Sequence, residues 1–183
     1  MLASAARFLL LLFLLLLPTT PGQAGYSEAE VKAAFLVNFG RFVEWPAAAA
    51  PLARQELRIG IMGNNPFGPA LGPLASQTVA GVPVRFARIS TLKEAARCHI
   101  LYLSPSLGPK VRRILRGLEG RPVLTVSDKK GFLEEGGAIE LMTIEQHIRF
   151  AINLEECGQH GMKVSSRLLE LARYVIMPKE EQK

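Results

Sequence analysis

The hydrophobic pattern that begins after residue 25 is helical. Ser27 followed by Glu30 has the spacing of a capping box, in which the two side chains bond backbone amides of the first helical turn. At 100° per residue, residues 31–45 place most large apolar side chains on one broad arc, and Asn38 falls inside it. We predict a helix with this arc against a core, Asn38 as a buried polar anchor, and an end at Pro46. The positions mostly off the arc are Lys32, Gly40, Arg41 and Glu44.

Extended runs alternate with short helical patterns along the middle of the chain, which is typical of βαβ units. The predicted strands are residues 57–62, 82–89, 99–103 and 123–126, with short helices around 92–96 and 109–118 between them. The predicted fold is therefore α/β, with a mainly parallel sheet and helices on both faces in a Rossmann-like three-layer arrangement.

The last third of the chain changes pattern. Two extended runs, 138–142 and 147–154, are joined by a short polar connection, which permits an antiparallel hairpin but no parallel crossover. Ser165 or Ser166 then caps a closing helix. The predicted apolar stripe of that helix is Leu168, Leu169, Ala172, Val175 and Ile176.

Residues 1–24 have the pattern of a cleaved signal peptide. Arg7 precedes the apolar run 8–17, which is shorter than the roughly 20 residues that span a bilayer, and small residues lead to Ala24. Cleavage after Ala24 leaves residues 25–183, which we expect to form a single exported domain. An uncleaved membrane anchor is the alternative.

The composition and the motifs argue against several classes of function and indicate no particular chemistry. The formal net charge is +6, but no block of basic residues or alternation of basic and aromatic residues occurs, so nucleic-acid binding is not expected. Cys98 and His99 would point to opposite faces of a strand, and no nucleophile motif is present. His147 and His160 lack the spacing of metal ligands. We expect no enzyme, metal or cofactor; an unrecognised hydrolase is the alternative that activity probes would detect.

The loop 63–68 follows the first predicted strand, where a doubly wound sheet places ligands. It lacks the glycine spacing of phosphate-binding loops, so a structural turn is the simpler interpretation. A small-ligand receptor using this loop is nevertheless a second functional hypothesis.

Two cysteines, Cys98 and Cys157, occur in a chain expected outside the cytoplasm. An even count in an oxidising compartment is commonly used for a disulfide, so their pairing is possible. Two buried thiols are an equal alternative.

The segments that carry a family resemblance are residues 32–46 (KAAFLVNFGRFVEWP), 63–68, 98–101, 123–128, Phe132 with 136–137, 149–153 and 165–169. In order and approximate spacing they resemble the YfiR-like family of bacterial periplasmic proteins. The resemblance covers essentially the whole of residues 25–183.

This resemblance implies a homodimeric, non-enzymatic repressor that binds the periplasmic sensory domain of an inner-membrane diguanylate cyclase and holds it inactive. Contact with the membrane would be through that partner alone, cyclic di-GMP would fall, and biofilm formation would be restrained. It also implies redox control through two disulfides. This chain has two cysteines rather than four, and Cys98 matches a bridge member whose usual partner is missing.

A repressor of this type needs an apolar, partly exposed contact surface. The candidates are Arg41, Glu44 and Trp45 at the end of the first helix, and Arg167 and Arg173 on the closing helix. A core position is the alternative for Trp45, and simple solvation is the alternative for the arginines.

Overall fold

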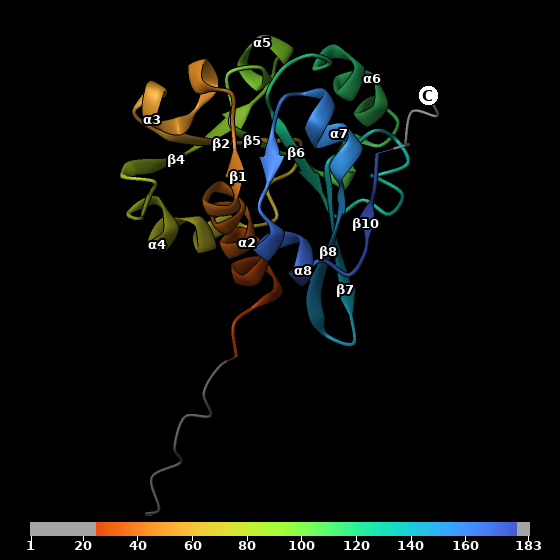
Figure 1. Ribbon diagram of the computed structural model, residues 1–183. Coiled ribbons are helices and arrows are strands. Elements are labelled where there is room, and N and C mark those ends of the chain that lie inside the picture. The colour runs from red at the N-terminus through yellow and green to blue at the C-terminus, as the bar shows by residue number, and fades with distance from the viewer. Residues whose placement is uncertain (1–24, 179–183) are drawn as a thin grey trace, which may run out of the picture.

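A central sheet organises the fold. The computed structural model describes residues 25–178, so the predicted signal peptide, residues 1–24, lies outside the described part. Eight strands follow the order β10-β8-β7-β6-β5-β2-β4-β3 (Figure 1). Their bounds are β2 Leu57–Met62, β3 Thr78–Val79, β4 Val82–Ile89, β5 Ile100–Leu103, β6 Leu124–Ser127, β7 Ile139–Ile144, β8 His147–Asn153 and β10 Val175–Ile176.

The strand pairing confirms the predicted mainly parallel sheet with an antiparallel hairpin. Strands β4, β2, β5, β6 and β7 are parallel to one another, and β7 turns back into β8. The hairpin register pairs Ile139 with Ile152 and Ile144 with His147. The edge strand β3 is antiparallel to β4, and the opposite edge strand β10 is parallel to β8.

Helices cover both faces of the sheet, as predicted. Their bounds are α2 Glu28–Phe42, α3 Pro51–Arg54, α4 Leu71–Ala75, α5 Leu92–Ala95, α6 Lys110–Gly117, α7 Leu154–Gln159 and α8 Ser166–Leu171, with short 3-10 turns at Ala47–Ala49, Gly68–Ala70 and Pro105–Leu107. Neighbouring residues of β5 alternate between two cores, with Tyr102 in the core beneath α2 and Leu103 in the core beneath α5 and α6. Alternation along a strand places these cores on opposite faces.

The capping box at the start of α2 forms as predicted, but the buried face of the helix differs from the predicted arc. The Ser27 side chain accepts from the Glu30 backbone, and the Glu30 carboxylate accepts from Ser27 N at 2.7 Å. Asn38 is exposed, so the prediction of a buried polar anchor is wrong. The residues of α2 that are buried are Lys32, Ala33, Leu36, Val37, Phe39 and Gly40.

Close packing explains which side of α2 meets the sheet. The helix is apolar around most of its circumference, so periodicity alone leaves its orientation open. A Cβ atom on Gly40 would lie 2.5 Å from Leu57 Cδ2 of β2, so a larger residue at this position would have to displace the buried Leu57 side chain. The close approach at Gly40 thus favours this buried face, which leaves Asn38 exposed to solvent.

The C-terminal segment also differs from the prediction. Helix α8 ends at Leu171, and Val175 and Ile176 form strand β10 instead of continuing an apolar helical stripe. The Arg173 backbone N–H donates to Phe150 O at 2.7 Å, and Ile152 N–H donates to Tyr174 O at 3.2 Å. Beside the open edge of β8, β-branched residues gain more from strand pairing than from one further helical turn.

A small antiparallel ribbon replaces the predicted last turn of the first helix. Strands β1 (Val43–Glu44) and β9 (Lys163–Val164) lie side by side in Figure 1. The register pairs Val43 with Val164 and Glu44 with Lys163. The ribbon therefore joins the end of α2 to the segment that leads into α8.

Candidate functional site

The carboxyl edge of the parallel strands contains a crevice between β2 and β4. The chain leaves β2 toward α4, whose Leu71 and Leu74 pack on the α2 side of the sheet. It leaves β4 toward α5, whose Ala95 packs on the opposite side. The strand order reverses between β2 and β5, so the topological switch point of the sheet is the neighbouring gap, and the crevice lies one strand away from it at the same carboxyl edge.

The loop after β2 closes the adjoining space toward β5. Asn64 N–H donates to Ser106 Oγ at 2.9 Å, and the Ser104 and Ser106 hydroxyls lie 2.9 Å apart. Gly63 has φ +90°, and a Cβ there would lie 2.9 Å from Ser106 Oγ. Glycine is therefore required at this turn. The predicted loop 63–68 is thus held by the turn after β5 on one side and is open to the crevice on the other.

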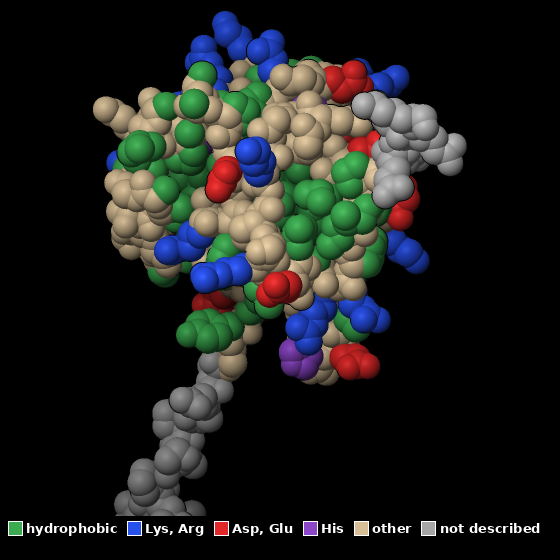
Figure 2. All heavy atoms as spheres, in the orientation of Figure 1, with side chains coloured by type: hydrophobic (Ala, Val, Ile, Leu, Met, Phe, Trp, Pro, Cys, Tyr) green, Lys and Arg blue, Asp and Glu red, His purple; other side chains and the backbone are tan. Residues whose placement is uncertain are grey.

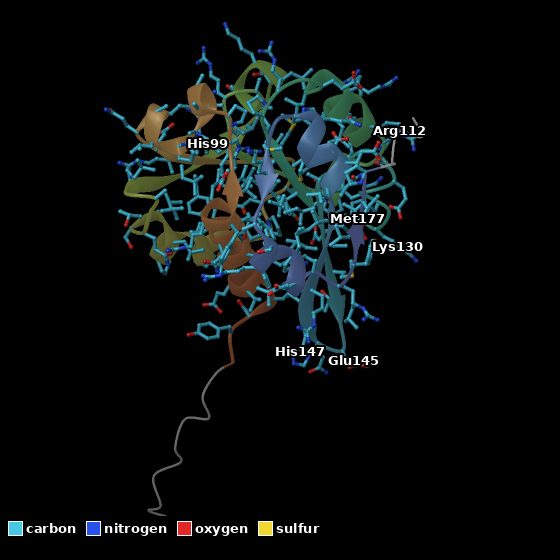
Figure 3. All side chains as sticks on the ribbon, in the orientation of Figure 1. His99, Arg112, Lys130, Glu145, His147 and Met177 are labelled. Atoms are coloured by element: carbon cyan, nitrogen blue, oxygen red, sulfur yellow. The ribbon has the colours of Figure 1, made fainter. Side chains whose placement is uncertain are left out.

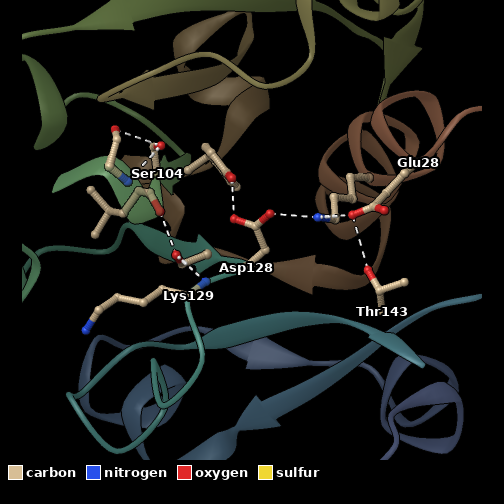
Figure 4. Close-up of polar contacts among 10 residues, drawn as sticks. Glu28, Ser104, Asp128, Lys129 and Thr143 are labelled. Carbon is tan, nitrogen blue, oxygen red and sulfur yellow. Dashed lines mark hydrogen bonds and ion pairs between the residues drawn. The ribbon is translucent and has the colours of Figure 1, made fainter. Parts of the chain in front are cut away.

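A polar network lies at the carboxyl ends of β5 and β6, with Lys32 and Tyr102 buried and Glu28 and Thr143 at the surface (Figure 4). Lys32 Nζ is 2.6 Å from Asp128 Oδ2 and 2.6 Å from Glu28 Oε1. The Tyr102 hydroxyl donates to Asp128 Oδ1 at 2.5 Å. Thr143 of β7 donates to Glu28 at 3.2 Å. The first turn of α2 is thereby tied to three strands of the sheet.

The charges in this network are mutually compensated. Burial lowers the pKa of Lys32, but hydrogen bonds to Asp128 and Glu28 outweigh burial, and the net shift is upward. The hydrogen bond from Lys32 lowers the pKa of Glu28. Burial and the bond to Asp128 raise the pKa of Tyr102 well above its ordinary value. A lysine held charged and a tyrosine held neutral are arranged for structure rather than for proton transfer.

The contact candidates on the first helix are separated by the fold. Trp45 is buried, with 7% of its surface exposed, so it occupies the core position considered as its alternative. Arg41 and Glu44 are exposed. The Arg41 guanidinium donates to Thr78 O of edge strand β3 at 3.5 Å, whereas Glu44 lies across from Lys163 in the ribbon.

The candidates on the closing helix lie beside an apolar surface that sequence reasoning missed. Arg167 and Arg173 are exposed at α8 and just after it. Leu171, Tyr174 and Met177 are 65%, 44% and 63% exposed. Figure 2 shows hydrophobic side chains gathered over α8 and β10, where Figure 3 labels Met177. We call Leu171, Tyr174 and Met177 the C-terminal patch. The predicted apolar stripe of the closing helix did not include these three residues, and sequence reasoning assigned them no role.

The two cysteines are unpaired. Cys98 packs in the core beneath α5 and α6, and Cys157 packs in the core beneath α2, so the sheet separates them. Burial raises the pKa of Cys98 to about 11 and that of Cys157 to about 12. Of the two sequence-based alternatives, the structure supports the buried thiols.

His99 and Trp45 form a buried contact under the β1–β9 ribbon. His99 is 1% exposed, and its Nδ1 accepts the Arg58 backbone N–H at 2.9 Å. The rings of Trp45 and His99 meet edge to face, with centroids 5.8 Å apart. Figure 3 shows His99 within the body of the molecule, in contrast to His147 at the tip of the β7–β8 hairpin. The histidine therefore connects the end of α2 to the sheet.

The mainly parallel sheet with helices on both faces defines a Rossmann-like α/β domain. The model of the YfiR/HmsC-like family matches residues 29–173, and the chain belongs to that family. Members are periplasmic, non-enzymatic regulators of diguanylate cyclase signalling. No helix among residues 25–178 is long and apolar enough to cross a membrane.

A solved structure of low sequence identity has a similar fold. A conserved domain protein from Vibrio cholerae O1 biovar El Tor has a TM-score of 0.57 at 11% identity, covering 81% of this chain and 60% of that one. This chain thus corresponds to only part of that relative. The ABC domain from Streptococcus pneumonia in complex with L-Trp has a TM-score of 0.44 at 13% identity, covering 65% of this chain and 56% of that one. A search of curated proteins finds no match.

Proposed function

We propose that this protein binds the periplasmic sensory domain of an inner-membrane diguanylate cyclase and holds the enzyme inactive. The family match over residues 29–173 is the observation that carries the proposal. Repression would lower cyclic di-GMP in the cell and restrain biofilm formation. Contact with the membrane would be through the cyclase alone.

Such repression requires binding energy rather than chemistry. A regulator shifts its partner toward one conformation when it binds that conformation more tightly than the other. A tenfold preference corresponds to about 1.4 kcal/mol, which a few well-packed side chains supply. A rigid scaffold with an exposed apolar surface meets this requirement.

The C-terminal patch is the surface we propose for the cyclase. Contiguous exposed apolar side chains mark interaction sites, and aromatic residues and arginine are enriched among contacts that dominate binding energy. Tyr174 supplies the aromatic ring, while Arg167 and Arg173 are exposed nearby. Because β10 is a terminal strand of the sheet, a partner strand has an edge to pair with.

The proposed contact extends toward Glu44 but not to the core side chain of Trp45. The β1–β9 pairing places Glu44 in the ribbon that leads into α8. Arg41 instead points toward β3 and is the most distant of the exposed candidates in the sheet order. We therefore expect Arg167 and Arg173 to contribute to binding more than Arg41.

The test is a pull-down of residues 25–183 with the periplasmic sensory domains of the membrane diguanylate cyclases from the same cell. Leu171→Asp should weaken capture at least tenfold and restore cyclase activity. Leu52→Asp is the matched control, because Leu52 is 70% exposed on α3, away from α8 (Figure 1). Absence of capture by any sensory domain would refute the proposed function. Equal losses in both variants would refute the proposed surface.

A homodimer is the second assembly implied by the family. Light scattering of residues 25–183 should give twice the monomer mass, and a monomer at micromolar concentration would contradict it. If Leu171→Asp dissociates the dimer and leaves cyclase capture intact, the C-terminal patch is the contact between two copies of this protein instead.

A small-ligand receptor is the second candidate function. The observation that favours it is the open crevice between β2 and β4, which lies outside the carboxyl ends of the parallel strands, the edge at which doubly wound sheets bind ligands. Saturable thermal stabilisation by a small molecule, without any partner protein, would support it.

A further inference from the structure

Two adjoining cavities occupy the crevice at the carboxyl edge, and both are bordered by Gly63, Asn64 and Arg88. One has a volume of about 560 Å³ and lies on the α4 side, with Ile61, Phe86 and other apolar groups in its wall. The second has a volume of about 440 Å³ and lies on the α6 side. Both are in the size range of small-molecule sites.

The second cavity is strongly cationic. Arg88 from the end of β4 and Lys110 and Arg113 from α6 line it, and no acidic side chain lines either cavity. Lys110 and Arg113 are three residues apart on a helix, so they extend from the same face. Within residues 25–178, none of the three forms an ion pair.

Three uncompensated cations around one concave surface repel one another and attract anions. The potential is focused where low-dielectric walls surround the charges, which raises the local concentration of an anionic ligand. The planar guanidinium groups of Arg88 and Arg113 suit bidentate binding of a carboxylate or phosphate, and Lys110 adds a point charge.

The first cavity has a different character. Phe86 of β4 is half-buried, and Leu71 of α4 also lines the wall. An apolar or aromatic body fits these side chains, while Arg88, shared by both cavities, is placed to reach an acidic group on the same molecule.

We propose that the two cavities form one site for a small organic anion, with its carboxylate or phosphate held by Arg88, Lys110 and Arg113 and its apolar body packed against Phe86. The site is independent of the C-terminal patch and therefore stands whether or not the cyclase is the partner. It names the class of ligand for the second candidate function, the small-ligand receptor.

The test is calorimetric titration of residues 25–183 with three probes: phenyl phosphate, phenylacetate and inorganic phosphate. We expect phenyl phosphate or phenylacetate to bind with saturation, the tighter of the two identifying the preferred acidic group. Phe86→Ala should lower the affinity for the aromatic probe at least fivefold and leave the affinity for inorganic phosphate unchanged.

The charge contribution is tested with matched arginine variants. Arg113→Gln should lower the affinity for the aromatic probe about tenfold, because it removes a charge-assisted bidentate contact. Arg112→Gln is the control, because Arg112 is exposed on the same helix, seen at the periphery in Figure 3, and lines neither cavity. Saturation by none of the probes, or equal weakening in both variants, would overturn the proposed site. A tenfold loss only in Arg113→Gln would support it.

Discussion

His99 makes the stability of the folded protein depend on pH. Burial, together with the charges of Arg54 and Arg58, lowers the pKa of His99 to about 4. In the unfolded chain the pKa is about 6.5. Because Nδ1 accepts the Arg58 backbone N–H, the neutral ring carries its proton on Nε2. Protonation of Nδ1 would remove that hydrogen bond and place a charge in the core.

The direction and size of the effect follow from proton linkage. Above pH 6.5 the histidine is neutral in both the folded and the unfolded protein, so it does not reduce the free energy of unfolding. As the pH falls below 6.5, the unfolded chain binds a proton that the folded protein excludes, so stability decreases until the pH reaches about 4. Between pH 7 and 5 this amounts to about 2 kcal/mol, and the limit below pH 4 is about 3 kcal/mol.

The assay uses the single tryptophan of the chain. Trp45 is buried against His99, so its fluorescence reports unfolding in urea at each pH. His99→Asn retains an acceptor for Arg58 but does not titrate. The loss of unfolding free energy between pH 7 and 5 should therefore be about 2 kcal/mol smaller in this variant than in the unmodified protein. His147→Asn, at an exposed position, should retain the full loss. An unchanged pH dependence in His99→Asn would refute the reasoning.

Four further predictions test the packing. Gly40→Ala should cost about 1–3 kcal/mol in urea unfolding because the new methyl meets Leu57, whereas Gly72→Ala, with open space around it, should cost less than about 0.5 kcal/mol. Lys32→Met leaves two carboxylates without their cation and should lower stability by about 3 kcal/mol; an unchanged melting temperature would contradict the network. Asn38→Leu should change stability by less than about 0.5 kcal/mol, and a larger loss would indicate a buried side chain. Both cysteines should react with a thiol reagent only after denaturation, and a reductant should not shift the melting temperature or cyclase capture.

Local sequence determined most of the secondary structure. The capping box at Ser27 and Glu30 places two complementary side chains within one turn, so it needs no tertiary contact to begin a helix. Strands β2 and β4 occur at the predicted residues because their apolar and β-branched content suits extended backbone wherever they pack. The short connection between β7 and β8 required a hairpin for reasons of chain geometry alone.

Tertiary structure decided which sides of these elements meet. Helix α2 is apolar nearly all round, so the small size of Gly40 and the shape of β2 determined its buried face and exposed Asn38. Val175 and Ile176 had helical spacing, but the open edge of β8 offered hydrogen bonds that a helix does not use. The cavity formed by Arg88 and Arg113 joins residues far apart in the sequence, because crossover connections bring the end of β4 beside α6. Periodicity describes one segment at a time, whereas burial and charge clustering depend on the segments that pack against it.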